Sequence, residues 1–363
     1  MDLIFNIKIL FIFAQKNFFI KMKSVNWAIL APGIIAHRMA EAMLKSKEKE
    51  KIKINLYAIG SHNLERAKEF AEKYGFERYY GSYKDLLSDS KVEAVYIANP
   101  HSFHFDSIME CFEAGKHVLC EKPAVCNMDQ LKKVIEKSKE KKLIFMEAMW
   151  TPFNPCIKRI RKVISEGKIG EIKHIESFIN GRAPFDPKSR LWAPELAGGA
   201  LLDIGIYNIF YSMIINNYEP IIKRSSNVRL FNGVDAWNSV DLTFKNGVTT
   251  HFETSIDIPN VSKTQDGVIY GTKGYIFSKD FLFQTQAEVH VYKGEGGNDN
   301  DLVELIDEPF DVNGFEYQLI EANECILDGK IESDIHGFQR SIDLCSIMDQ
   351  LRNDWGFKYP FEK

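Results

Sequence analysis

The 363-residue chain has little of what marks a secreted or metal-binding protein. No CxxC pair occurs, and a chain of this length does not need a disulfide framework. Reduced thiols and a cytoplasmic location are therefore expected. The nine histidines include no HExxH spacing, so we expect no metal site. The six cysteines are Cys111, Cys120, Cys126, Cys156, Cys325 and Cys345.

Strong charge of one sign is also missing, because the formal net charge is only -4. The lysine-rich segments 45–53 and 132–142 both alternate lysine with glutamate, which is typical of solvated helix faces or loops. The sequence therefore favours neither nucleic acid nor a membrane as a partner.

The first 23 residues lack a convincing signal peptide. Asp2 is present, no basic residue precedes Lys8, and the longest apolar run, Ile9 to Ala14, is shorter than a signal-peptide core. No A-x-A-like cleavage site follows, and this apolar run is too short to span a bilayer. We interpret residues 1–23 as a non-native or mis-started extension, with Met22 as the natural first residue; a signal peptide is the alternative.

Residues 24–148 show strand and helix patterns in alternation, which predicts a parallel sheet in a doubly wound dinucleotide-binding domain. The strand 92–98 carries almost no charge, as expected when both faces of a sheet are covered. Predicted strands span 25–31, 52–59, 92–98, 117–120 and 143–147, and predicted helices span 34–44, 63–74, 102–114 and 129–141.

Residues 149–363 predict a second α/β domain with a large, mostly antiparallel sheet, because its strand-like segments follow one another without long helices. Asn246-Gly247 is a hairpin signal. We expect this domain to bind substrate and to dimerise, with its last helices able to pack back on the first domain. Predicted strands span 174–180, 227–230, 239–244, 248–255 and 288–292.

The turn after the first predicted strand resembles a dinucleotide fingerprint, G-x-G-x-x-G/A. The segment Ala31-Pro32-Gly33-Ile34-Ile35-Ala36 has Ala31 at the first glycine position, while Gly33 stands where the backbone must approach a pyrophosphate. The following helix N-terminus, at Ile34 and Ile35, offers N–H groups to phosphate. An ordinary tight turn is the alternative.

Four segments together resemble the Gfo/Idh/MocA family of oxidoreductases. Their order and spacing agree across about residues 25 to 345. Tyr207 stands where many members have histidine, which resembles the branch of glucose–fructose oxidoreductases, dimeric dihydrodiol dehydrogenases and NADP-dependent xylose dehydrogenases. The segments are WAILAPGIIA (27–36), ANPHSFH (98–104), GKHVLCEKP (115–123) and GGALLDIGIY (198–207).

The resemblance implies an enzyme that moves hydride between a nicotinamide cofactor and a sugar, polyol or diol carbon, and it implies a homodimer. It also implies that Lys122, Asp203 and Tyr207 are catalytic and that Trp192, Asp203 and Tyr207 contact substrate. The resemblance places a larger set at the cofactor: Ala31, Gly33, Ile34, Ile35, Ser61, His62, Asn99, Pro100, His104, Glu121, Lys122 and Arg190.

Tyr207 is expected to take the hydroxyl proton, with its pKa lowered by the ammonium of Lys122. Asp203, four residues earlier and on the same helix face, is expected to accept hydrogen bonds from substrate hydroxyls. Whether Lys122 or Tyr207 takes the proton stays open. The structural alternatives are a surface ion pair between Lys122 and Glu121, and a core position for Tyr207.

NADP is the expected cofactor, with NAD possible. No carboxylate follows the strand 52–59, so nothing there would repel a 2′-phosphate. Ser61 can donate a hydrogen bond to it, whereas His62 replaces the arginine of NADP-using relatives and lacks its permanent charge. His104 either lines the cofactor cleft or is a structural histidine.

Two other functions fit parts of this pattern. An NAD-dependent glycosidase would use transient oxidation by a tightly held cofactor. A non-catalytic regulator would keep the nucleotide site but lose the lysine of Glu121-Lys122-Pro123, and Lys122 is present.

Overall fold

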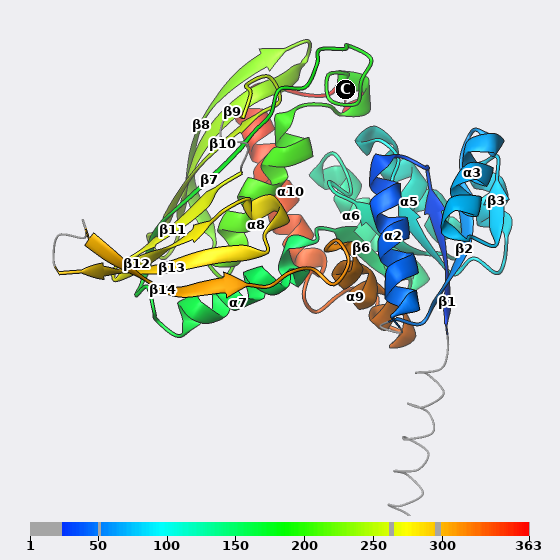
Figure 1. Ribbon diagram of the computed structural model, residues 1–363. Coiled ribbons are helices and arrows are strands. Elements are labelled where there is room, and N and C mark those ends of the chain that lie inside the picture. Colours follow the sequence, from blue (N-terminus) through cyan, green and yellow to red (C-terminus); the bar gives the residue numbers. More distant parts are fainter. Residues whose placement is uncertain (1–23, 50–51, 261–264, 295–298, 363) are drawn as a thin grey trace, which may run out of the picture.

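The computed structural model describes residues 24–49, 52–260, 265–294 and 299–362. Two sheets with their helices lie side by side, and the helices α8 and α10 run between them (Figure 1). The predicted extension over residues 1–23 falls outside the described residues.

The first sheet is fully parallel, with strand order β3-β2-β1-β4-β5-β6. The order reverses between β1 and β4, which is where open α/β sheets bind ligands. Its strands are β1 (Val25–Leu30), β2 (Ile54–Gly60), β3 (Arg78–Tyr80), β4 (Ala94–Ile97), β5 (His117–Glu121) and β6 (Phe145–Ala148). Its helices are α2 (Ile34–Glu48), α3 (Leu64–Tyr74), α4 (Tyr83–Ser88), α5 (His104–Glu113) and α6 (Met128–Lys141).

Local sequence explains where these helices begin. Asn63, Ser82 and Asn127 precede α3, α4 and α6, and the side chain of each accepts a backbone N–H of the first turn. The strands β1 and β4 are buried almost throughout, so helices cover both faces of the sheet.

The second sheet has eight strands in the order β14-β13-β12-β11-β7-β10-β9-β8. Only the pairing of β7 with β10 is parallel, so the sheet is mostly antiparallel, and the predicted fold class is confirmed. The strands are β7 (Ile172–Asn180), β8 (Ile221–Phe231), β9 (Val234–Phe244), β10 (Thr249–Ser255), β11 (Gly267–Gly271), β12 (Gly274–Ser278), β13 (Gln286–Lys293) and β14 (Asp299–Asp307).

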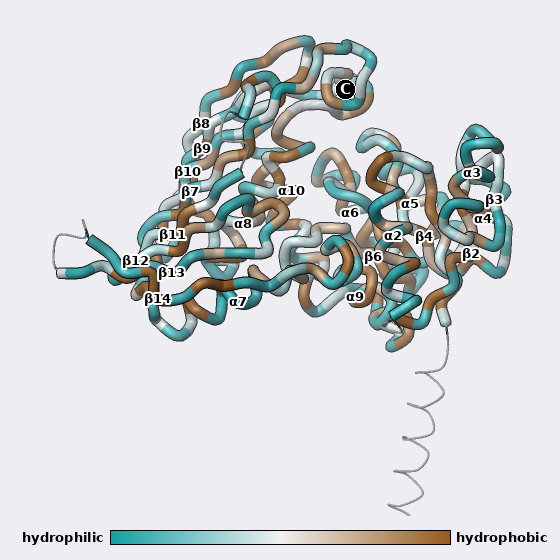
Figure 2. The backbone as a smooth tube through the Cα atoms, in the orientation of Figure 1, coloured by the Kyte–Doolittle hydropathy of each residue, from teal (hydrophilic) through white to brown (hydrophobic). Residues whose placement is uncertain are grey.

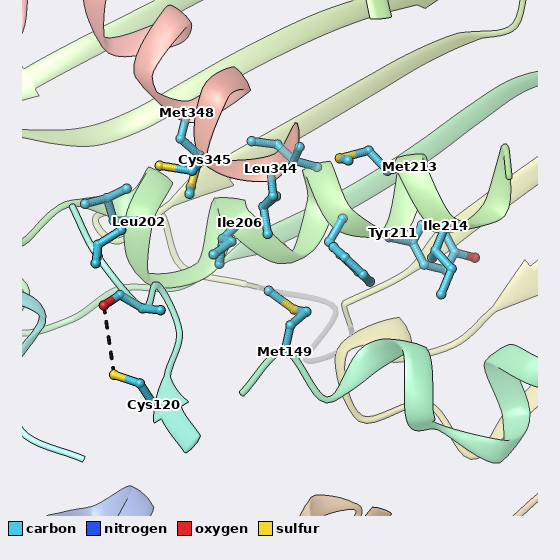
Figure 3. Packing of buried hydrophobic residues seen from close by; sticks show 14 of the residues in the cluster. Cys120, Met149, Leu202, Ile206, Tyr211, Met213, Ile214, Leu344, Cys345 and Met348 are labelled. Carbon is cyan, nitrogen blue, oxygen red and sulfur yellow. Dashed lines mark hydrogen bonds between the residues drawn. The ribbon is translucent and has the colours of Figure 1, made fainter. Parts of the chain in front are cut away.

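Helices α7 (Pro155–Ser165), α8 (Ile206–Ile215) and α10 (Phe338–Asp354) lie on one face of this sheet. Figure 3 shows α8 and α10 in contact through Ile206, Leu344, Cys345 and neighbouring apolar side chains. The apolar residues gather in the interior of both parts, as the brown segments of Figure 2 show. The core of the second part is therefore the layer between its helices and its sheet.

The helical stretch Pro194–Ile215 is long and apolar enough, by composition, to cross a membrane. Within the protein 89% of its apolar window is buried, which is typical of a core helix. All six cysteines are buried and free.

The last two helices contact the first domain. Helix α9 (Phe315–Leu327) packs beside α2, and Asn323 on it accepts a hydrogen bond from the Trp27 indole at 3.1 Å. Helix α10 lies on α6, where the Met128 N–H donates to the Asp349 carboxylate at 2.8 Å. The chain therefore returns to the first, parallel sheet after building the second one.

Four strands were not predicted: β3, β11, β12 and β14. Strand β3 has only three residues, and β11 and β12 are five-residue strands that begin with glycine. Strand β14 is an exposed edge strand rich in acidic residues. Such segments carry a weak periodic pattern, and pairing with neighbouring strands makes them extended.

Candidate active site

A cavity of about 690 Å³ opens at the carboxyl edge of the parallel sheet. The turns after β1, β2, β4 and β5 form one wall, and the segment 190–207 of the second domain forms the other. The size suits a dinucleotide together with a small substrate. The lining residues are Ala31, Pro32, Gly33, Ile34, Ile35, Ser61, His62, Asn63, Arg66, Tyr83, Ala98, Asn99, Pro100, His101, His104, Glu121, Lys122, Arg190, Leu196, Asp203, Ile204 and Tyr207.

The turn after β1 fits a pyrophosphate. Gly33 precedes α2 in an extended conformation, no side chain caps the helix, and no acidic residue lies in its first turn. The N–H groups at Ile34 and Ile35 and the positive end of the helix dipole are thus available to an anion. Ala31 adopts the left-handed conformation, with φ 73°, at the position where the fingerprint has its first glycine.

The turn after β2 forms the next part of the wall. The Ser61 hydroxyl accepts the Asn63 N–H at 3.1 Å, and the His62 ring lies 4.3 Å from the ring of Tyr83. Arg66, which the sequence analysis missed, donates to the Pro32 carbonyl at 3.2 Å and lines the same end of the cavity. Its position in the first turn of α3, four residues after His62, is the signal that could have identified it.

His104 connects the turns that follow β4 and β5. Its two ring nitrogens lie 2.7 Å from the Pro123 carbonyl and 2.8 Å from the Asn99 carbonyl, and the residue is fully buried. The Asn99 amide also donates to the Ser107 hydroxyl at 2.8 Å. His104 therefore has the contacts of a structural histidine, although it also lines the cavity.

Lys122, Asp203 and Arg190 form a charge cluster at the other end, in which Lys122 and Asp203 are largely buried and Arg190 is half exposed. The Lys122 ammonium donates to the Asp203 carbonyl and lies 3.5 Å from its carboxylate Oδ1. The Arg190 guanidinium donates to the same oxygen at 2.7 Å. Burial opposes the ionisation of Asp203, but Lys122 and Arg190 hold the pKa of its carboxyl well below the usual range.

Two predicted site residues pair with each other here. The Asp203 carboxylate, predicted to serve substrate hydroxyls, contacts Lys122 and Arg190. Arg190, predicted at the cofactor, donates to Asp203, and both roles stay predictions. Both residues line the cavity, so their charges still shape the site.

The expected lowering of the Tyr207 pKa is wrong. Burial, followed by the charges of Glu121 and Asp203, raises the pKa of the Tyr207 hydroxyl well above its ordinary value. The Lys122 ammonium lies over the face of the Tyr207 ring, 4.9 Å from its centre, and is itself paired with Asp203. Within the described part of the chain the Tyr207 hydroxyl has no hydrogen-bond partner.

His101 is a second residue to which the sequence analysis gave no role in the site. Its Nδ1 lies 3.2 Å from the Ala197 carbonyl, so this nitrogen carries the ring proton. Its Nε2 faces the Asp203 carboxylate at 4.0 Å. Burial lowers the pKa of His101 to about 3, so the ring is neutral and Nε2 is an acceptor within the cavity.

The sequence analysis predicted that Asp203 and Tyr207 lie on one regular helix, and the structure contradicts this. Residues Leu201–Gly205 form a π-helical turn, and α8 begins only at Ile206. Such turns are rare and are found frequently at functional sites. The wider turn carries the Asp203 carbonyl that accepts the Lys122 ammonium.

Trp192 lies outside the residues that line the cavity. The ring is 3% exposed, its indole N–H donates to the Pro184 carbonyl at 3.1 Å, and it packs edge-on against Phe185 and Phe231. Trp192 therefore belongs to an aromatic cluster, and its contact with substrate stays a prediction. Among the described residues no group of three or more His, Cys, Asp or Glu side chains could hold a metal ion.

The doubly wound sheet, the uncapped helix at its switch point and the adjoining Lys–Asp–Tyr cluster define an NAD(P)-dependent oxidoreductase that acts on CH–OH groups. Residues 25–149 match the oxidoreductase family with an NAD-binding Rossmann fold, and residues 157–277 match the GFO/IDH/MocA C-terminal domain. The chain belongs to the Gfo/Idh/MocA family of oxidoreductases, as its motifs predicted.

Full-length relatives support this assignment. Trans-1,2-dihydrobenzene-1,2-diol dehydrogenase from Mus musculus is 33% identical over 354 residues, covering 94% of this chain and 99% of the relative. The Homo sapiens protein of the same name is 31% identical over 351 residues, with the same coverage.

Solved structures share the fold. A 3-ketoreductase from Actinomadura kijaniata, in complex with NADP and TDP-benzene, has a TM-score of 0.79 and 24% identity, covering 91% of this chain and 98% of that one. Levoglucosan dehydrogenase in complex with NADH also has a TM-score of 0.79, with 18% identity, covering 93% of this chain and all of the other.

Proposed function

We propose that this enzyme is an NADP-preferring dehydrogenase of vicinal diols or sugars, with Tyr207 as its acid–base group and Lys122 as its partner. The observation that carries the proposal is the position of Tyr207. Its hydroxyl has no partner within the described residues, while Lys122 is held over its ring and both line the cavity. A substrate oxygen placed there would contact both groups.

Bound nicotinamide would accept or supply the hydride, and the protein residues would manage the proton. Because its pKa is raised, Tyr207 is protonated at neutral pH and suits proton donation to a carbonyl oxygen. In the oxidative direction the same oxygen takes the hydroxyl proton, and this becomes easier as the pH rises. Glu121, whose buried carboxyl has a pKa raised to about 7, lies close enough for its charge to oppose that ionisation.

Lys122 orients the reacting oxygen. An ammonium has three N–H donors. One is donated to the Asp203 carbonyl, and the ammonium lies 3.5 Å from the Asp203 carboxylate, which leaves a donor for substrate. Asp203 thus acts by holding Lys122 in place rather than by direct contact with the reacting oxygen.

A substrate with a second hydroxyl could also use the polar atoms of His101 and Asp203. The neutral His101 ring presents an acceptor nitrogen 4.0 Å from an Asp203 oxygen, and a hydroxyl could donate to either atom. The relatives named trans-1,2-dihydrobenzene-1,2-diol dehydrogenase support a diol, and the structural neighbour levoglucosan dehydrogenase supports a sugar. Both substrates present adjacent CH–OH groups.

The turn after β2 supports a preference for NADP. No acidic side chain is among the residues that line this end of the cavity, whereas Arg66, Ser61 and His62 are. Arg66 supplies the permanent positive charge that His62 lacks, and a 2′-phosphate would benefit from it. The site provides no carboxylate that would select NAD.

The test is an assay of several substrates in which the absorbance of reduced nicotinamide is measured. The purified protein is mixed with NADP or NAD and with a trans-dihydrodiol, D-xylose or a glycoside. We expect stoichiometric reduced cofactor from the diol or the free sugar, and a higher kcat/KM with NADP. Glycoside cleavage without net reduction of added cofactor would favour an NAD-dependent glycosidase and contradict the proposal.

We also propose that the protein is a cytoplasmic homodimer. Six free thiols suit a reducing compartment. The face of the second sheet opposite its helices carries side chains such as Glu176, Phe178 and Tyr270, and family resemblance pairs such faces between subunits. Light scattering should give twice the chain mass, and a monomer at micromolar concentration would contradict the proposal.

A further inference from the structure

We infer that Asp235 and Tyr359 are positioning residues, which hold the Gly198-Gly199 turn and thereby fix Asp203 and Tyr207 in the active site. Neither residue lines the cavity or belongs to a motif noted in the sequence. The inference rests on the proposed catalytic roles of Lys122 and Tyr207.

Asp235, at the start of β9, binds the beginning of the π-helical turn. Its Oδ2 accepts the Leu201 backbone N–H at 2.7 Å and the Asn238 amide at 3.0 Å. The residue is fully buried, and its Oδ1 has no hydrogen-bond partner among the described residues. Burying a carboxylate with one oxygen unpaired is costly, so a local requirement for this side chain is expected.

The Gly198-Gly199 turn fits against this carboxylate without space for side chains. Gly199 has φ 115°, which disfavours any other residue, and a Cβ there would clash with Asp235 Oδ1. A Cβ on Gly198 would clash with the Leu191 carbonyl. The turn is thus confined between β9 and the segment that carries Arg190.

Tyr359 holds the same turn from the other side. Its hydroxyl donates to the Gly198 carbonyl at 2.7 Å, and the residue is fully buried after the end of α10. The Arg352 guanidinium lies 5.0 Å from the Tyr359 ring centre and pairs with Glu362 at 2.6 Å. The segment after α10 is therefore fastened to the turn that precedes the catalytic residues.

The Gly198-Gly199 turn also links Arg190 to Asp203, the two members of the charge cluster that lie on either side of it in the sequence. The Gly199 N–H donates to the Leu191 carbonyl at 2.9 Å, and the Gly198 N–H donates to the Ala193 carbonyl at 3.1 Å. Arg190 lies directly before this segment, and Asp203 lies four residues after Gly199. A shift of the turn would therefore change the Arg190–Asp203 distance, and with it the position of Lys122. Misplacement by about 1 Å can cost roughly 100-fold in rate.

The test compares Asp235→Ala, Asp235→Asn and Tyr359→Phe with the full-length wild-type enzyme. The matched control is Asp241→Ala, because Asp241 lies on the same strand with its carboxylate exposed at the surface. The measurements are kcat and KM for substrate, the Kd of NADPH by fluorescence, and the melting temperature. Tyr207→Phe is assayed alongside.

We expect Asp235→Ala to lower kcat by about 10- to 100-fold with the Kd of NADPH within about threefold of wild type. Asp235→Asn keeps an oxygen for the Leu201 N–H and should recover most of kcat, and Tyr359→Phe should lose about 3- to 10-fold. A wild-type kcat in folded Asp235→Ala would overturn the inference. A loss of kcat in the control Asp241→Ala as large as that in Asp235→Asn would also overturn it.

The melting temperature separates positioning from folding. If Asp235→Ala does not fold, Tyr359→Phe decides, because it removes only one hydroxyl; wild-type kcat in that variant would then overturn the inference. If Tyr207→Phe keeps wild-type kcat, the proposed catalytic roles fail. If Tyr207→Phe is impaired while the Asp235 and Tyr359 variants are not, only the positioning inference fails.

Discussion

The Lys122 ammonium lies over the face of the Tyr207 ring, 4.9 Å from its centre. A cation in that position is attracted to the ring face, whereas a hydrogen bond to the hydroxyl would favour the phenolate directly. Burial and the charges of Glu121 and Asp203 raise the pKa of the Tyr207 hydroxyl. The ammonium, which donates to the Asp203 carbonyl, keeps a further donor for substrate. The two groups can address one substrate oxygen together, one through a proton and the other through a hydrogen bond.

The raised pKa of Tyr207 predicts the pH dependence of turnover. Alcohol oxidation needs the phenolate, so kcat should increase with pH over the range from about 7 to above 10, the ordinary value for tyrosine. Glu121→Gln removes a charge that raises this pKa, and should shift the profile to lower pH. The measurement is kcat at saturating diol across this range. An unshifted profile in Glu121→Gln would exclude that electrostatic coupling.

Asp203 links activity to stability. Because its pKa is lower in the folded protein than in the unfolded chain, its ionisation stabilises the fold above about pH 4 and this contribution is lost as the pH falls further. Asp203→Asn should cost about 2–3 kcal/mol at pH 7, less than a fully buried pair because Arg190 is half exposed.

The check on Asp203 is denaturant unfolding at pH 7 and at pH 3. The difference between Asp203→Asn and wild type should shrink at the lower pH. If the difference in unfolding free energy is the same at both pH values, the charge of Asp203 does not stabilise the fold.

Ala31 carries backbone strain at the cofactor turn. A non-glycine residue with φ 73° costs roughly 1–2 kcal/mol, so Ala31→Gly should relieve strain, offset by about 0.5–1 kcal/mol of added freedom in the unfolded chain. We expect unchanged or slightly higher stability and NADPH affinity. Ala36→Gly, within α2, is the control and should destabilise by about 1 kcal/mol. Lower stability in Ala31→Gly than in Ala36→Gly would contradict this reading.

Sequence patterns predicted the architecture and most of the cavity wall. The apolar strands and the βα alternation were enough to predict the first sheet. The spacing of the motifs was enough to predict that Gly33, Lys122 and Tyr207 lie at one site. Long, periodic segments carry such information locally. Family membership and the class of reaction were also predicted correctly.

What the sequence could not predict depends on contacts between distant segments. The pKa of Tyr207 depends on burial and on Glu121, and the pairing of Asp203 depends on Arg190 and Lys122. Trp192 packs against Phe231, which lies on a strand distant in the sequence. None of these contacts leaves a periodic signal in the sequence.

Cofactor selection should depend on Arg66 more than on His62. Arg66→Ala should raise the KM for NADP by about tenfold at pH 6 and pH 8 alike, because a guanidinium keeps its charge. His62→Ala should raise the KM for NADP less than Arg66→Ala does, because an imidazole lacks the permanent charge and the forked donors of a guanidinium. Assays with NAD are the control, and equal losses with both cofactors would show that these residues do not contact a 2′-phosphate.

The most direct test of the catalytic assignment is the single-turnover rate of cofactor reduction in wild type, Tyr207→Phe, Lys122→Ala and the double variant, each saturated with NADP and diol. Each single variant should lose about 100- to 10,000-fold, and the double variant should lose far less than the product, because the two residues act on one oxygen. A Tyr207→Phe variant that reduces the cofactor at the wild-type rate would contradict the account and leave Lys122 as the proton acceptor.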